Sequence, residues 1–116
     1  MNPQSVIDQP TFETLKESMG ADFLPELVQA YLEETPQLLL KLQEALAKKD
    51  CIEFRQAAHS IKSTSNSFGA LEFGALAKEL EMIGREGNLE NAPGKVKDLV
   101  EGYAMVIRTL KELIDA

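Results

Sequence analysis

Apolar residues recur at intervals of three and four along almost the whole chain, and no segment alternates apolar and polar residues as a half-buried strand would. This pattern predicts a short first helix over residues 11–18, with Thr11 as its N-cap and Gly20 after its end. Four longer helices are predicted after it, over residues 23–48, 50–68 and 70–85 and across residues 96–113. Four amphipathic helices with short connections favour an all-α fold, an antiparallel four-helix bundle with a short extra N-terminal helix.

Two of the predicted helices have a regular apolar seam, which indicates packing at shallow angles in a bundle. In the second helix the seam consists of Leu24, Val28, Tyr31, Leu38, Leu42 and Ala45. In the last helix it consists of Val96, Leu99, Tyr103, Val106, Leu110 and Leu113. Pro25 falls in the first turn of the second helix, where its missing N–H is harmless. Pro36 lies in the middle of that helix, so we expect a kink or a loosened turn near Thr35.

The length of 116 residues fits one domain, which we place at residues 11–116, after an N-terminal tail of residues 1–10. No apolar run approaches the ~20 residues that cross a bilayer, and the N-terminus lacks the basic start and apolar stretch of an export signal. We therefore expect a soluble, monomeric, cytoplasmic protein. The net charge of −7 opposes binding to nucleic acid and to anionic membranes, so protein partners are favoured. A single cysteine and a single histidine cannot supply a typical structural zinc site, so no metal is expected.

The direction of the single histidine, His59, follows from the helical wheel of the third predicted helix. Residues that fall on one side of this wheel form the predicted buried face, namely Phe54, Ala58, Ile61, Ser65 and Phe68. His59 lies about 140° from the centre of that face at 100° per residue, and we therefore expect it to point to solvent. The same exposed side contains Arg55, Gln56, Lys62, Ser63 and Asn66.

The residues around His59 suit a side chain that accepts a phosphoryl group. Arg55 and Lys62 lie about one turn before and after it, where two cations can stabilise a dianionic phosphoryl group. A neutral imidazole has a lone pair for attack on phosphorus, and short serine side chains leave the ring accessible to a docking protein. On these residues alone, a polar solvent-exposed face without a function is an equally good interpretation.

The stretch A-H-S-I-K-S-T-S-N-S-F-G-A, residues 58–70, resembles the signature of histidine-containing phosphotransfer domains, A-H-x-L-K-G-x-S-x-x-[LI]-G-A. The identical positions in register with that signature are Ala58, His59, Lys62, Ser65, Gly69 and Ala70. Leu80-Glu81 resembles the L-E pair of the family's next helix, and F-L-P-E-L-V-Q-A-Y-L-E-E-T-P-Q-L-L is similar to its second helix. The similarity covers residues 12–113. One departure is Ser63, because most members have glycine at this position, directly over the imidazole.

The resemblance implies a free-standing phosphorelay carrier of bacterial type. Such a domain accepts a phosphoryl group on His59 from a receiver-domain aspartyl phosphate and passes it to another response-regulator receiver. The expected partners are receiver domains of hybrid sensor kinases and response regulators. We expect Lys62 to stabilise the phosphoryl charge, Ser63 to set the clearance over the imidazole, and the magnesium ion to sit on the partner receiver, with no cofactor here. The predicted partner-binding residues are Ile52, Arg55, Gln56 and Asn66.

Three other functions fit the sequence less well than phosphotransfer. The chain lacks a Walker-type G-x-x-x-x-G-K-[ST] loop, so an ATP-dependent kinase activity of its own is not expected. The chief alternative is a phosphorylation-independent helical adaptor, and Ile52, which projects about 160° from the core direction, can serve as an apolar anchor in either case. The substitution His59→Gln separates the two hypotheses, because it abolishes signalling only in a phosphotransfer protein. A hydrolase is disfavoured because no serine or cysteine has a suitably spaced histidine and carboxylate.

Overall fold

The computed structural model describes residues 6–115, and all regular structure in that range is helical. The described helices are α2 (Gln9–Met19), α3 (Leu24–Lys48), α4 (Cys51–Ser67), α5 (Leu71–Glu86) and α6 (Ala92–Asp115). The prediction of an all-α protein is confirmed. No helix within residues 6–115 combines the length and the apolar character of a transmembrane segment.

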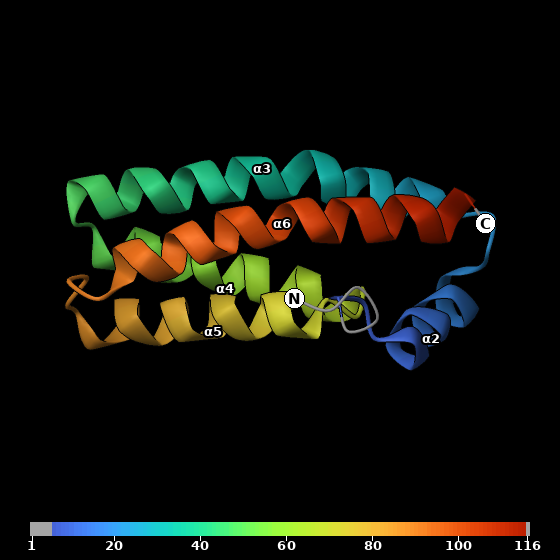
Figure 1. Cartoon of the computed structure of the whole chain (residues 1–116), viewed down its shortest axis with the longest axis horizontal. Helices are drawn as coiled ribbons and strands as arrows, with labels where there is room; N and C mark the ends of the chain where they lie inside the picture. Colours follow the sequence, from blue (N-terminus) through green and yellow to red (C-terminus); the bar gives the residue numbers. More distant parts are fainter. Residues whose placement is uncertain (1–5, 116) are drawn as a thin grey trace.

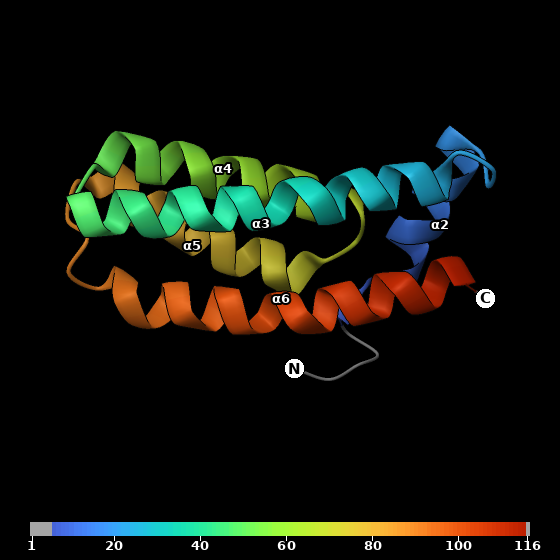
Figure 2. The same cartoon turned by 90° about the horizontal axis from the view of Figure 1, so that it is seen from above.

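The four longer helices lie side by side, and successive helices run in opposite directions (Figure 1). Helix α3 packs on α4, α4 on α5, α5 on α6, and α6 back on α3, so the four helices enclose one core. The short helix α2 lies at one end of this group, where it contacts α4 (Figure 2). This arrangement leaves the outer faces of the neighbouring helices α4 and α5 open to solvent.

The core is one cluster of buried apolar side chains to which every described helix contributes. In α6 the predicted seam is buried from Val96 to Leu110, and only Leu113 is half-buried. In α3 the predicted seam is buried except at Leu38, which is half-buried and packs against the edge of the core, and Thr35 and Leu39 are buried core positions that the prediction did not include. The helix is continuous through Pro36, whose side chain faces solvent.

The N-terminal boundary differs from the prediction. Val6 and Ile7 are 0% and 2% exposed, so part of the predicted tail lies in the core, while residues 1–5 are outside the described range. Helix α2 begins before Thr11, since the Asp8 carboxylate caps it by accepting a hydrogen bond from the Thr11 N–H at 3.2 Å. The Asp8 N–H donates to the carbonyl of Gly69 at 2.7 Å, which ties the start of the domain to the end of α4.

Gly69 is required at that junction for two reasons. Its φ of +89° is a conformation that side chains with a Cβ rarely adopt, and a Cβ at this position would lie 2.8 Å from the carbonyl oxygen of Asp8. The glycine predicted to stop the third helix therefore also permits the N-terminal segment to pack against it.

Candidate functional site

His59 lies near the middle of α4 on the side away from the core, and 58% of its side chain is exposed. The helix is fixed at its start by Asp50, whose carboxylate accepts a hydrogen bond from the Glu53 N–H at 3.0 Å. The side chains that anchor α4 in the core are Phe54, Ala57, Ala58, Ile61 and Ser65. The prediction that His59 points to solvent is confirmed.

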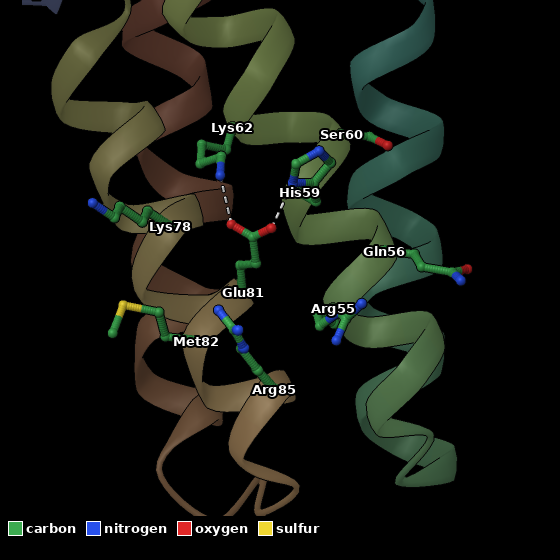
Figure 3. A pocket seen from close by; sticks show the side chains of 9 residues that line it. All are labelled: Arg55, Gln56, His59, Ser60, Lys62, Lys78, Glu81, Met82 and Arg85. Carbon is green, nitrogen blue, oxygen red and sulfur yellow. Dashed lines mark hydrogen bonds and ion pairs between the residues drawn. The ribbon is translucent and has the colours of Figure 1, made fainter.

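A carboxylate from the next helix contacts the imidazole. Nδ1 of His59 lies 2.5 Å from Oε2 of Glu81 on α5 (Figure 3). An ionised carboxylate only accepts hydrogen bonds, so we assign the ring proton of the neutral imidazole to Nδ1, which donates it to Glu81. This tautomer leaves Nε2 without a proton and with its lone pair available to an incoming electrophile.

The second oxygen of the same carboxylate holds Lys62. Oε1 of Glu81 accepts a hydrogen bond from Nζ of Lys62 at 2.7 Å, so one carboxylate bridges the ammonium and the imidazole. Burial alone would raise the pKa of Glu81, but the hydrogen bonds from Lys62 and His59 outweigh it and hold the pKa below its ordinary value of 4.5. Glu81 is therefore ionised at neutral pH and keeps the proton of the imidazole on Nδ1.

The spacing of α4 and α5 allows this contact. A Cβ placed on Gly84 of α5 would lie 3.1 Å from the backbone N and Cα of Arg55, which is closer than side chains normally approach. Glycine thus lets the backbone of α5 lie close to that of α4. Glu81 lies one turn before Gly84, and from there its side chain reaches across to His59.

The imidazole borders a groove between α4 and α5 (Figure 3). The residues that line it are Arg55, Gln56, His59, Ser60, Lys62, Lys78, Glu81, Met82 and Arg85. The structure thus brings together His59, Lys62, Arg55 and Gln56, which the sequence predicted as site residues.

The other predicted residues lie outside the groove. Ser63 is exposed one turn after His59, and Ile52 is 73% exposed near the start of α4. Asn66 is half-buried against α5, where a Cβ on Gly74 would lie 2.0 Å from its Oδ1. Ile52 and Ser63 are therefore open to a partner, whereas Asn66 already packs within the protein.

A second polar contact joins the core side of α4 to α3. The hydroxyl groups of Tyr31 and Ser65 are 2.7 Å apart, and both side chains are buried. Burial raises the pKa of Tyr31 to about 12, against the opposing effect of its hydrogen bond with Ser65, so the tyrosine is protonated at neutral pH. Ser65 thus links α4 to α3, and it does not reach the groove.

The sequence pattern alone predicts no role for Glu81 or for the other α5 residues of the groove. The sequence nevertheless contains an indication of where Glu81 lies, because the preceding residue, Leu80, is an apolar position of α5 and is fully buried. The next residue on a helix lies about 100° from a core anchor, which places Glu81 at the border between core and solvent. The missing information was which neighbouring helix faces that border.

Comparison with known proteins agrees with this geometry. The family model of the Hpt domain matches residues 26–116. Two proteins named phosphorelay protein LuxU, from Vibrio vulnificus strains YJ016 and CMCP6, are each 29% identical over 83 residues, or 72% of either chain. The crystal structure of histidine-containing phosphotransfer protein B (HptB) from Pseudomonas aeruginosa PAO1 matches with a TM-score of 0.89 at 29% identity and covers 95% of each chain. An exposed histidine on a helical scaffold, together with a family model that spans most of the sequence, shows that this chain belongs to the Hpt domain family of histidine phosphotransfer proteins.

Proposed function

We propose that this protein carries a phosphoryl group on Nε2 of His59 between two receiver domains. The observation that carries the proposal is the hydrogen bond from Nδ1 to Glu81, which leaves Nε2 of an exposed imidazole free. The names of its relatives, a phosphorelay protein and a histidine-containing phosphotransfer protein, support the same function. An adaptor that works without phosphorylation has no use for this arrangement and is not favoured.

The transfer step needs no proton movement to or from the imidazole. The lone pair of Nε2 attacks phosphorus, the N–P bond forms, and the bond from phosphorus to the aspartate oxygen breaks with its electrons going to the carboxylate. The ring becomes positively charged, because Nδ1 keeps its proton. The carboxylate of Glu81, 2.5 Å from Nδ1, stabilises this developing charge and was already in place before the reaction. The reverse step returns the phosphoryl group to a second aspartate.

Lys62 and Ser63 keep the roles that the sequence predicts, as proposals. Lys62 is 24% exposed and lies on the same carboxylate as the imidazole, so its charge is close enough to favour a bound phosphoryl group. Ser63 is exposed one turn further along α4, on the path of a docking receiver. We place the magnesium ion of the reaction on the receiver, where it would offset the charge of the transferred group.

The receiver docks, in this proposal, on the exposed side of α4 around His59. Ile52 offers an apolar anchor and Arg55 and Gln56 border the groove, whereas Asn66 contributes only at the edge because it packs against α5. We propose that the scaffold is an antiparallel four-helix bundle capped by α2. We further propose that it acts as a cytoplasmic monomer that does not bind nucleic acid, in keeping with its charge of −7.

A labelling experiment tests the function directly. Purified receiver domains are phosphorylated with radiolabelled acetyl phosphate, freed of the donor, and mixed with the protein. We expect one phosphoryl group per chain, labile in acid and stable in alkali, and no label on His59→Gln with an unchanged circular dichroism spectrum. Labelling from ATP alone, or equal labelling of His59→Gln, would contradict the proposal. A reaction with acetyl phosphate but no receiver controls for direct modification.

A further inference from the structure

Two arginines lie together in the α4–α5 groove, about one turn from His59. Arg55 comes from α4 and Arg85 from α5, both are exposed, and both line the groove (Figure 3). The close approach at Gly84 explains why they are neighbours, because a Cβ there would lie 3.1 Å from Cβ of Arg55, and Arg85 is the next residue. The packing of the two helices therefore holds two like charges at the same level of the groove.

These two charges have no counter-ion within the part of the chain that the structure describes. Neither Arg55 nor Arg85 forms an ion pair with a carboxylate of residues 6–115. The single carboxylate that lines the groove, Glu81, uses one oxygen for His59 and the other for Lys62. Two exposed guanidinium groups thus border the groove without an ion-pair partner among residues 6–115.

The net charge of the groove lining is positive, whereas that of the whole protein is negative. The chain has 19 acidic and 12 basic residues, yet the groove lining contains four cations and one carboxylate. Those four cations are Arg55, Lys62, Lys78 and Arg85. An acidic partner is repelled by most of this protein and attracted to this face, so charge alone directs it to the side that carries His59.

The two arginines are not placed to hold the phosphoryl group itself. In Figure 3 they lie on the side of Glu81 away from Lys62, whereas Nε2 of His59 is directed away from them. His59 itself lines the groove, so a receiver that brings its aspartyl phosphate to Nε2 comes next to the groove as well. Its surface there meets two planar guanidinium groups, which bind carboxylates through paired hydrogen bonds.

We propose that Arg55 and Arg85 form an arginine clamp that recognises carboxylates on the surface of the receiver, beside the phosphorylated aspartate. This inference rests on the proposed phosphotransfer function and adds a determinant of partner choice to it. Met82, which is 52% exposed in the same groove, gives the partner an apolar contact next to the clamp. Receivers with acidic residues at this place dock well, and receivers with neutral or basic residues there dock poorly.

The three arginines of the chain provide a matched experiment. Arg55→Gln, Arg85→Gln and the control Arg108→Gln are compared with the parent as acceptors from phosphorylated receivers, by rapid quench at increasing receiver concentration. Arg108 is 75% exposed on α6 and pairs with Glu112, away from the groove. We expect each clamp variant to raise the half-saturating receiver concentration by about tenfold at low ionic strength, with the limiting rate unchanged. The difference shrinks as salt screens the charges, and Arg108→Gln matches the parent.

The outcomes separate the clamp from the function on which it rests. If the parent is labelled on His59 and both clamp variants behave like Arg108→Gln, the clamp is refuted and phosphotransfer stands. If the limiting rate falls while half-saturation stays constant, the arginines act on the transferred group, and the docking role is refuted. If no receiver labels the parent at all, the proposed function and the clamp fail together. Thermal unfolding of each variant shows whether a loss comes from misfolding.

Discussion

Replacing Glu81 by alanine tests the central claim about the site, that a carboxylate keeps the imidazole proton on Nδ1. The substitution removes the acceptor 2.5 Å from Nδ1 and frees Nε2 to take the proton instead. A hydrogen bond to a charged group contributes about 1.5–3 kcal/mol. Because 58% of the His59 side chain is exposed and water replaces part of the lost contact, we take the lower end, about 1.5 kcal/mol. A barrier higher by about 1.4 kcal/mol slows transfer about tenfold.

The assay measures the rate of transfer from a phosphorylated receiver at a saturating concentration, with nitrogen-15 NMR of the imidazole as a direct report of the tautomer. Glu79→Ala is the matched control, since Glu79 also lies on α5 and forms an ion pair, with Lys95 at 3.0 Å. We expect Glu81→Ala to lose the preference for a proton on Nδ1 and to transfer about tenfold more slowly than Glu79→Ala. A rate within twofold of the control, or an unchanged tautomer, would refute the role of Glu81.

Three further predictions concern the same face. Lys62→Ala slows transfer or shortens the lifetime of the phosphohistidine, measured as the loss of label over time. The free energy of unfolding in chemical denaturation falls by only about 0.5–1 kcal/mol, because the ion pair is partly exposed. Ser63→Gly transfers as fast as the parent or faster, at about 0.5–1 kcal/mol of helix stability, whereas Ser63→Phe blocks transfer with an unchanged thermal midpoint; slower transfer by the glycine variant would show that the hydroxyl takes part. The folded pKa of Glu81 lies below 4.5, so its ionisation stabilises the fold above that pH and this contribution disappears as the pH falls through the folded value. Urea titrations of the parent should therefore lose more stability on acidification from about pH 5 to pH 3 than those of Glu81→Gln, and parallel losses would contradict the shift.

The direction of His59 could be predicted because it depends on one helix only. Phe54, Ala58 and Ile61 define the buried side of α4, and the angle from them to His59 follows from helix geometry. The role of Glu81 could not be predicted in the same way, because its contact joins residues 22 positions apart on two helices. That contact depends on the axial register and spacing of α4 and α5, which the apolar pattern of each helix leaves open.

The errors in the fold have physical causes as well. The apolar pattern of α3 places Leu38 in the seam, whereas Thr35 and Leu39 are buried after Tyr31 and Leu38 only borders the core. A buried threonine is not recognised when only apolar residues are taken as core positions. Val6 and Ile7 form too short an apolar pair to show a period, and the hydrogen bond that ties the next residue, Asp8, to Gly69 joins positions far apart in the sequence.

Gly84 has no side chain and sets the close spacing of α4 and α5, and the reactivity of the imidazole depends on that spacing. His59 and Glu81 belong to different helices, so the 2.5 Å contact between Nδ1 and Oε2 depends on the spacing of α4 and α5. An increase of about 1 Å takes this pair out of hydrogen-bond range, and the proton is then no longer assigned to Nδ1. A change that separates the two helices, such as a bulky side chain at position 84 or a molecule bound between them, should therefore slow phosphoryl transfer without contacting His59.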